Sequence, residues 1–461
     1  MTVERVATQT NMAAGAKRVP LGPKGLPFVG MALNLRNDPL AGMRDMTRQY
    51  GDIVYFQVMM QDRILLNHPD WIHQVLVIQH NKFHKSELTR RVTARMLGQG
   101  LLISEGDFWR RQRRLAQPAF HRSRVNDYGV AMLELAESYI RDWRDGESRN
   151  IGGEMTALTL QVAVKTLFGT TLPEEARGVG QAMTFLMRYS LRRQRLPFRI
   201  PETWPTPANR RANRELAFID SLVYRIISER QAEGDATHHN DLLALLMGAM
   251  DDDGTHMTRQ QLHDETMTLF LAGHETTAQM LSWTWYALSH NPAVEARLHE
   301  ELSTVLGSRP IETADFSKLP YLQAVMNEVL RLYPPAYIMA REAIEPCEIG
   351  GYTFQPGSTI IFSQWVMQRD PRFFEDPEAF RPERWLDGLE DRLPPGAYFP
   401  FGDGPRRCIG QGFALLEAAI VIATLARRFR FSLAPGAVVV PEPLVTLRPR
   451  HGIQMIVHTR N

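Results

Sequence analysis

Cysteine is scarce in this sequence: Cys347 and Cys408 are the only two in 461 residues. Two thiols cannot build a disulfide framework or fill a four-cysteine zinc or iron–sulfur site. The first twenty residues also lack the apolar run of ~7 to 15 residues that a signal peptide needs, and the ~20 that a membrane-spanning helix needs. We therefore expect a cytoplasmic protein without an integral membrane anchor.

A strong excess of charge is missing as well. The sequence has 53 Lys and Arg against 51 Asp and Glu, a net charge of +2, so we expect no nucleic acid partner. Internal repeats and low-complexity linkers are also absent. We expect a monomer with a single domain over residues 20–461, preceded by a flexible tail of residues 1–19.

Helical patterns dominate up to about residue 330, and short strands and turns follow from Cys347, which indicates a mainly α fold with a smaller β-rich portion. Residues 20–30 have too many prolines and glycines for a helix and are predicted to form an extended leader. The predicted hairpin strands are residues 52–58 and 63–68, and the predicted loops are residues 196–209 and 234–241.

A glycine-rich loop carries Cys408 to the start of a long apolar helix, in FPFGDGPRRCIGQGF at residues 399–413. The positive end of that helix, with Arg406 and Arg407, is expected to favour the thiolate, which is a strong metal ligand. Glycines in the loop allow tight turns and the approach of a flat group. The alternatives are a small buried hydrophobic residue and a dinucleotide loop, but G-x-G-x-x-G fails at Arg407.

This loop resembles the haem-binding signature of the cytochromes P-450, F-x-x-G-x-R-x-C-x-G, at Phe401, Gly404, Arg406, Cys408 and Gly410. The resemblance implies that the chain binds haem b and that the Cys408 thiolate is the axial ligand of its iron. It also implies that Phe401 packs beside the thiolate, that Arg406 pairs with a haem propionate, and that Gly410 lies against the cofactor.

The longest helical pattern runs from Thr258, which starts a capping box, to about His290. At its middle, Gly273 and several polar residues interrupt an apolar stretch at some cost in stability. One explanation is a solvated turn in which Thr276 bonds back to a carbonyl. The other is a site where glycine opens the helix beside a ligand and an acid–alcohol pair relays protons. AGHETT at 272–277 resembles the oxygen-side motif of the same family, which assigns stabilisation of bound oxygen to Thr276 and proton supply to Glu275.

Glu328 and Arg331 are three residues apart in a predicted helix, a spacing that usually gives a weak surface pair. Followed by FRPERW at 380–385, they resemble the buried scaffold network of the family, with Arg384 as its third member. Trp109 and Arg113 in the basic segment FWRRQRR resemble its propionate-binding motif, and Arg341 lies where the family often has another propionate ligand. The alternative for this segment is a solvated charged face.

The resemblance covers nearly the whole chain and implies a triangular prism of helices around a long central helix, with haem buried between that helix and the cysteine loop. It implies a monooxygenase that inserts one oxygen atom of O₂ into a hydrophobic small molecule such as a fatty acid, terpenoid, steroid or polyketide. The alternatives are a peroxide-driven peroxygenase and a non-catalytic haem sensor or electron carrier. By analogy of position, the predicted pocket residues are Met96, Leu97, Leu101, Phe270, Ala272, Tyr337, Ile338, Val445 and Thr446.

The sequence continues for 53 residues after Cys408, and we expect no fused reductase. We therefore expect electrons from NAD(P)H through a separate ferredoxin or flavodoxin and its reductase. The remaining basic residues are expected to form a docking patch for such acidic donors, and they are Arg110, Arg111, Arg114 and Arg407. Cys347 and the pair His238-His239 are assigned no chemistry.

Overall fold

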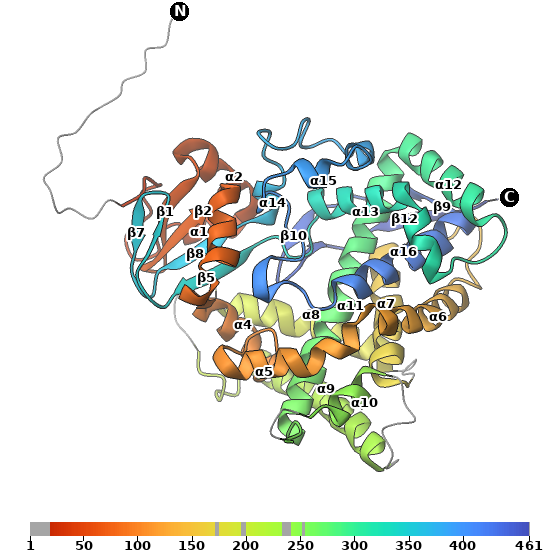
Figure 1. The fold of residues 1–461 in the computed structure, drawn as a ribbon, viewed down its shortest axis with the longest axis horizontal. Coiled ribbons are helices and arrows are strands. Elements are labelled where there is room, and N and C mark those ends of the chain that lie inside the picture. The colour runs from red at the N-terminus through yellow and green to blue at the C-terminus, as the bar shows by residue number, and fades with distance from the viewer. Residues whose placement is uncertain (1–18, 171–174, 195–199, 233–240, 251–253, 461) are drawn as a thin grey trace, which may run out of the picture.

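A computed structural model describes residues 19–170, 175–194, 200–232, 241–250 and 254–460. Helices make up most of the molecule, and the strands near the N-terminal leader gather at one end of it (Figure 1). The predicted tail falls almost wholly on residues 1–18, outside the described ranges, as do His238-His239 and nearly all of the predicted loop 234–241. Within the described ranges, no helix combines the length and apolar content that crossing a bilayer requires.

The helices end where the sequence supplies prolines, glycines or capping side chains. α7, for example, begins at the Asn150 cap and ends at Gly169, whose φ of 66° suits glycine. The α-helices of the described residues are α1 (Ala32–Asn37), α2 (Pro39–Tyr50), α3 (Pro69–His73), α4 (Glu87–Leu97), α5 (Gly106–Ala116), α6 (Arg122–Tyr139), α7 (Ile151–Phe168), α8 (Glu175–Gln194), α9 (Pro207–Ala232), α10 (Leu242–Gly248), α11 (Arg259–His290), α12 (Pro292–Leu306), α13 (Pro320–Leu332), α14 (Gln364–Met367), α15 (Leu389–Arg392) and α16 (Gln411–Arg428).

The strands of the described residues form small sheets, of which the largest has the order β1-β2-β8-β5-β3. Its β2–β8 pair is parallel and its other pairs are antiparallel. The strands are β1 (Ile53–Val58), β2 (Gln61–Leu66), β3 (Phe83–Lys85), β4 (Ser148–Asn150), β5 (Met339–Ala343), β6 (Cys347–Ile349), β7 (Tyr352–Phe354), β8 (Thr359–Phe362), β9 (Phe429–Leu433), β10 (Pro441–Pro443), β11 (Leu447–Pro449) and β12 (Gln454–Thr459).

The predicted hairpin is present, with a shorter turn than the sequence indicates. Met59 and Met60 both have positive φ, 52° and 60°, which is the geometry of a two-residue hairpin turn. Gln61 and Asp62 therefore belong to β2, two residues earlier than predicted. Their polar side chains misled the prediction because that end of β2 is exposed. The predicted loop 196–209 is also too long, since α9 already begins at Pro207.

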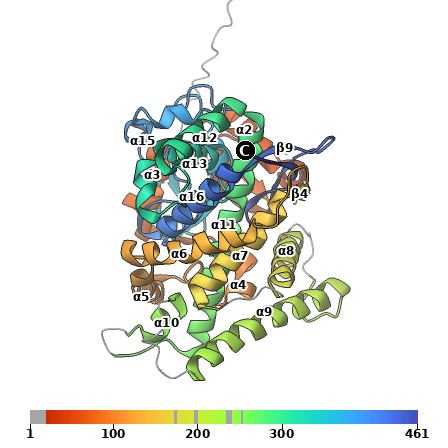
Figure 2. The same ribbon diagram turned by 90° about the vertical axis from the view of Figure 1, so that its right-hand side faces the viewer.

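α11 is the central helix, and the sequence predicts its limits correctly. The Thr258 hydroxyl accepts from the Gln261 amide, and the Gln261 side chain bonds the Thr258 backbone, which completes the capping box. The helix packs against α7, α13, α16 and β9, and Figure 2 shows it running through the middle of the helical part. Most of its length is buried on all sides, as expected of a core helix rather than a surface one.

A buried carboxylate ties α13 to the irregular chain before the cysteine loop. Glu328 and Arg331 are both fully buried. Two guanidinium nitrogens of Arg331 lie 2.8 Å from the two Glu328 carboxylate oxygens. Arg384 Nε donates to the same carboxylate at 3.1 Å, and Trp385 Nε1 donates at 2.9 Å. The structure therefore contains the three-residue contact that the sequence predicts.

We expect Glu328→Gln to lower the free energy of unfolding by about 3 to 5 kcal/mol, because it leaves the buried Arg331 charge uncompensated. Asp107→Asn is the control, since Asp107 and Arg110 pair at the same spacing on an exposed surface; its loss costs at most ~0.5 kcal/mol. Denaturant unfolding of both variants makes the comparison. Equal effects would show that the buried network contributes no more than a surface pair.

Glu417 is a second buried carboxyl group, on the face of α16 that meets α11. Only 1% of the residue is exposed, and neither carboxyl oxygen has a hydrogen-bond partner among the described residues. Burial raises the pKa of Glu417 well above its usual value. The nearby Thr277 hydroxyl, which donates to the Gly273 carbonyl, offsets this rise only in part. Folding therefore favours the protonated form of Glu417.

We expect Glu417→Gln to stabilise the fold at pH 7.5 and to change it little at pH 5. When folding raises the pKa of an acid, the free energy of unfolding of the protein falls as the pH rises above the unfolded pKa of that acid, here about 4.5. The fall is about 1.4 kcal/mol per pH unit and ends when the folded pKa is reached. The amide removes this dependence. Unfolding at both pH values measures it, with the exposed Glu348→Gln as control. A variant that loses stability equally at both pH values would contradict the assignment.

Candidate active site

The loop that carries Cys408 is held in a tight turn. The Cys408 amide donates to the Phe401 carbonyl at 2.9 Å, and a short 3₁₀ helix, η7 (Gly404–Arg406), lies between them. Gly404 has a φ of 66°, and a Cβ there would lie 2.0 Å from the Leu76 carbonyl oxygen. Glycine is therefore required at Gly404 by both backbone conformation and space.

At Gly410, neither the backbone conformation nor the space left by the rest of the chain requires glycine. It is the N-cap of α16, with a φ of −90°. A Cβ at Gly410 would lie 3.5 Å from the nearest atom, on Phe120, which is an ordinary contact. The prediction that glycine is needed for the turn thus applies to Gly404 and to Gly402, whose φ is 71°. Contact between Gly410 and a flat cofactor stays a prediction.

The Cys408 thiol lies in a recess. The residue is exposed to solvent, yet enough protein surrounds the sulfur that burial raises its pKa. The Gly410 amide, Arg113 and Arg407 lower that pKa without overcoming burial. The helix end and Arg407 thus lower the pKa as predicted, but desolvation outweighs them in the chain by itself, so the expectation that the helix end, Arg406 and Arg407 favour the thiolate fails there. A bound metal ion is what would hold the sulfur deprotonated.

The middle of α11 exposes one short stretch of an otherwise buried helix. Ala272 is exposed, and Gly273 and Thr276 are half-buried, whereas Leu271 and Thr277 on either side are buried. A Cβ at Gly273 would meet only a Leu167 methyl, at 3.8 Å. The helix therefore presents an open, small-residue surface where the oxygen-side motif lies.

Three basic side chains with one carboxylate meet beside the cysteine loop. Lys85 of β3 lies opposite Arg341 of β5 in the sheet register. Arg406 donates to the Ser104 carbonyl at 2.8 Å and also bonds Glu105. Burial is the largest cause that lowers the pKa of Lys85 well below its usual value and the pKa of Arg341 and of Arg406 to about 10. Repulsion from Arg406 lowers the pKa of Lys85 and of Arg341 further, and repulsion from Arg113 lowers that of Arg406. Among the described residues, Glu105 is the acid that offsets these charges.

This cluster lacks negative charge, because three cations face a single carboxylate. Buried charge without a partner is costly, so the arrangement fits a ligand that brings anionic groups. The sequence predicts Arg341 and Arg406 here but not Lys85, since only the pairing of β3 with β5 brings it to the site. Haem, with two propionates, is such a ligand.

Trp109 stacks against a side chain of the cation cluster, whereas Arg113 bonds the backbone of the cysteine loop. The Arg406 guanidinium stacks on the Trp109 ring, with its carbon 3.8 Å from the ring centroid. Arg113 donates to the Arg407 carbonyl of the cysteine loop at 3.0 Å, and its guanidinium carbon lies 5.9 Å from the Trp109 ring centroid. Trp109 therefore supports the cluster from beneath Arg406, and a propionate contact of Arg113 stays a prediction.

Cys408 offers a single metal ligand, so it suits an iron whose other ligands come from a cofactor. Among the described residues, no group of three or more His, Cys, Asp or Glu side chains is arranged to hold a metal ion. A single recessed thiol, a small-residue opening on α11 and a cluster short of negative charge fit a haem, whose porphyrin supplies the remaining ligands. Cys408 would ligate the iron, while Lys85, Arg341 and Arg406 would face the propionates.

Glu275 and Thr276 do not bond each other. The Thr276 hydroxyl donates to the Ala272 carbonyl at 3.0 Å, which is the back-bonding that the sequence leaves as an alternative. Glu275 is buried, and its Oε1 accepts from Thr446 Oγ1 at 2.9 Å and lies 3.1 Å from a nitrogen of Arg448. Sequence reasoning missed Arg448, because nothing in the local pattern LRPR marks a partner 173 residues earlier.

The predicted pocket residues divide into two groups. Ala272 is exposed and Ile338 and Val445 are half-buried, so these three present surface to a ligand. The other six are buried, and two are plainly core residues: Leu97 is 0% and Phe270 1% exposed, within the cluster that packs α7 against α11. The Thr446 hydroxyl donates to Glu275, and contact of Thr446 with a ligand stays a prediction. Analogy of position does not reveal which side of a buried helix faces a ligand.

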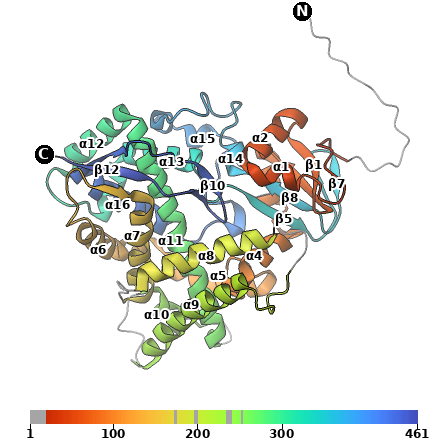
Figure 3. The same cartoon turned by 180° about the vertical axis from the view of Figure 1, so that it is seen from behind.

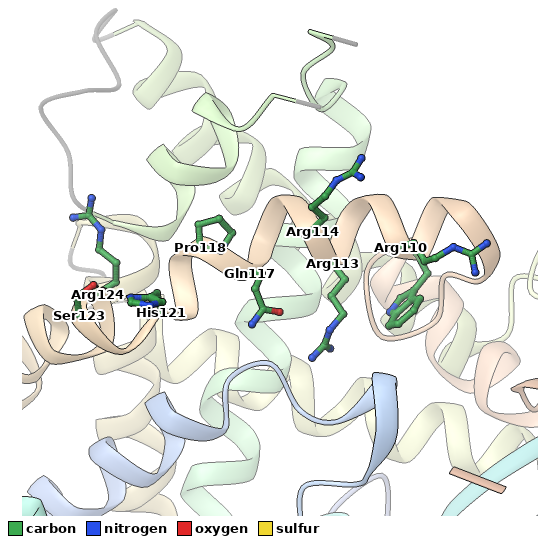
Figure 4. A pocket seen from close by; sticks show the side chains of 9 residues that line it. Arg110, Arg113, Arg114, Gln117, Pro118, His121, Ser123 and Arg124 are labelled. Carbon is green, nitrogen blue, oxygen red and sulfur yellow. Dashed lines mark hydrogen bonds between the residues drawn. The ribbon is translucent and has the colours of Figure 1, made fainter. Parts of the chain in front are cut away.

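A hollow of about 780 Å³ lies along α5, and Trp109 and Arg113 belong to its lining. Figure 4 shows Arg110, Arg113 and Arg114 projecting from this helix, with Arg113 directed toward the cysteine loop and Arg114 away from it. Arg124 and His121 complete a basic rim. Of the predicted patch, Arg111 lies elsewhere, since it donates to the Thr255 hydroxyl at 3.0 Å. Arg407 lines a neighbouring hollow beside the cysteine loop.

Comparisons with known proteins agree with this site. The family model described as Cytochrome P450 matches residues 20–457. Cyclooctatin synthase of Streptomyces melanosporofaciens is 36% identical over 96% of both chains. Cyclooctat-9-en-7-ol 5-monooxygenase of the same organism is 34% identical over 90% of both chains. Pentalenene oxygenase of Streptomyces avermitilis is 33% identical over 92% of this chain and 94% of its own. The chain belongs to the cytochrome P450 family and is a haem-dependent P450 monooxygenase.

Proposed function

We propose that this P450 inserts one oxygen atom of O₂ into a cyclic terpenoid, by hydroxylation or epoxidation. The names of two relatives that match nearly the whole chain give cyclooctat-9-en-7-ol and pentalenene as the compounds they oxidise. Both compounds are apolar ring systems. The candidate ligand surface of this chain is also apolar, with Ala272, Ile338 and Val445 presenting it. The apolar surface suits all four substrate classes left open by the sequence, and the names of the two relatives favour terpenoids among them.

The observation that most directly supports monooxygenase chemistry is the arrangement of Cys408, the cation cluster and the Ala272–Thr276 opening. Haem, when bound, supplies the iron that activates dioxygen. Cys408 would ligate that iron, and the cations would fix the propionates. The Thr276 hydroxyl lies at the open stretch of α11 and is free to exchange its bond to Ala272 for one to a bound ligand. Glu275, one residue away, is the acid that would renew its proton.

We further propose that two electrons come from NAD(P)H through a separate ferredoxin or flavodoxin and its reductase. The basic rim of the α5 hollow supports this assignment, because Arg110, Arg114 and Arg124 suit an acidic partner. The hollow lies close to the cysteine loop, which Arg113 contacts. We place the reaction in the cytoplasm, since two cysteines in 461 residues suit a reducing compartment.

A panel of ligands tests the substrate class. We expect cyclic sesquiterpenes and diterpenes, and their alcohols, to shift the spin state of the haem-loaded protein at micromolar concentration. Fatty acids and steroids should do so at least tenfold more weakly. Reconstituted turnover under ¹⁸O₂ should give one labelled oxygen in the product. Cys408→Ser is the control, because it should lose the red-shifted carbon monoxide spectrum of thiolate-bound haem. Preferential binding of fatty acids would overturn the terpenoid assignment.

Thr276→Ala separates the monooxygenase from its alternatives. We expect product formed per NAD(P)H to fall about tenfold or more, with peroxide released instead, because a proton-transfer group has been lost. Thr277→Ala is the matched control, since its hydroxyl is tied to the Gly273 carbonyl on a buried face of α11. Product formation driven by peroxide alone would favour a peroxygenase. Unchanged coupling in Thr276→Ala would remove Thr276 from proton delivery.

A further inference from the structure

A buried acid near the start of α11 holds the loop that joins α4 to α5, residues 98–105. Glu265 is 0% exposed, and its Oε2 accepts from the Leu101 amide of this loop at 3.0 Å. Its Oε1 accepts from Gln112 Nε2 of α5 at 3.1 Å, and Gln112 is also buried. Both carboxyl oxygens of Glu265 therefore bond groups outside α11, one in the α4–α5 loop and one in α5.

Close packing leaves the α4–α5 loop little freedom against α11. Gly98 has a φ of 51°, and a Cβ there would collide with the Asp264 carboxyl group of α11. A Cβ at Gly100 would collide with the Thr268 hydroxyl of the same helix. The loop therefore approaches α11 as closely as glycine allows. α4 also packs against α11, and Figures 1 and 3 both show α4 and α5 side by side.

The far end of the same loop holds Arg406 of the cation cluster. The Ser104 carbonyl accepts from Arg406 Nη1 at 2.8 Å, and Glu105 bonds the other terminal nitrogen of that guanidinium. Glu105 also accepts from the Lys85 amide at 2.6 Å. Within the loop, the Ser104 amide donates to the Gly100 carbonyl at 3.1 Å. A hydrogen-bonded turn thus joins the part of the loop that meets α11 to the part that meets Arg406.

We propose that Glu265 is a positioning residue for the cofactor, which fixes Arg406 through the α4–α5 loop. The inference rests on the proposed function, because it takes the cation cluster as the site of the haem propionates. The hydrogen bonds of Glu265 go to Leu101 and Gln112, so Glu265 acts on the cluster through the loop backbone. A loop released from Glu265 moves the Ser104 carbonyl that orients the Arg406 guanidinium.

The rate of haem loss tests this role without turnover. We expect ferric Glu265→Gln to release haem to an excess of a haem-scavenging globin about three- to tenfold faster than wild type. An amide has one acceptor oxygen where the carboxylate has two, so a donor of Gln112 or of Leu101 loses its partner. The change in the Soret band measures the rate at pH 8, above the pKa of Glu265, which burial raises to about 7.

A double variant shows whether the effect passes through Arg406. Arg406→Gln should itself speed haem loss, because it removes a partner of a propionate. Adding Glu265→Gln to Arg406→Gln should change the rate less than about twofold, since the side chain that Glu265 positions is then gone. Effects that multiply in the double variant would overturn the inference, because Glu265 would then act independently of Arg406.

Two further variants separate positioning from general loosening of the fold. Glu265→Gln/Gln112→Glu exchanges the two side chains, gives each donor an acceptor again and should restore the wild-type rate of haem loss. Glu301→Gln is the matched control, because Glu301 accepts from two backbone amides at the start of α13, at 2.7 and 2.8 Å. It should lower the free energy of unfolding and leave the rate of haem loss unchanged.

Gln112→Met keeps the test available if Glu265→Gln does not fold. It removes one of the two partners of Glu265 and should speed haem loss in the same direction. Equal acceleration in Glu301→Gln, or an exchange variant as fast as Glu265→Gln, would overturn the inference.

Failure of the proposed function has a different signature. If Arg406→Gln loses haem faster while Glu265→Gln and Gln112→Met do not, the inference alone is overturned and the cofactor site stands. If Arg406→Gln keeps haem as well as wild type does, the cation cluster does not bind the propionates. The proposed cofactor site is then wrong, and the inference drawn from it is overturned as well.

Discussion

The cysteine loop depends on a carboxylate that is far from it in sequence. Glu328 fixes Arg331, and Arg331 donates to the Gln368 carbonyl at 2.9 Å. The Gln368 side chain accepts from the Phe399 amide at 3.1 Å, and the Cys408 amide donates to the Phe401 carbonyl. A series of hydrogen bonds and short chain segments thus links α13 to the backbone of Cys408. Because this chain segment has little regular structure, side chains supply the order that a strand or helix would supply elsewhere.

The buried charged and acidic groups around α11 have three different surroundings. Burial raises the pKa of Glu417, whose carboxyl oxygens have no hydrogen-bond partner among the described residues. Glu275 forms an ion pair with Arg448 at 3.1 Å. Lys85, together with Arg341 and Arg406, remains in excess over Glu105, which is the state expected of a site completed by an anionic cofactor.

The sequence predicts those parts of the site that depend on local backbone and missed those that depend on pairing between distant segments. Gly404 and Cys408 lie in one loop whose turn needs glycine, and the capping box at Thr258 fixes where α11 starts. Lys85 joins the cluster only through the β3–β5 register, and no local pattern encodes that. The thiol pKa was predicted with the wrong sign because a helix end is a local feature, whereas desolvation comes from the whole fold.

α5 borders both the hollow and the candidate haem site. Arg110 and Arg114 line the hollow together with Trp109 and Arg113. Arg406 stacks on Trp109, and Arg113 bonds the backbone of the cysteine loop. A helix is stiff over this length, because its backbone hydrogen bonds are internal. A protein bound in the hollow would therefore contact the same side chains that support the cysteine loop.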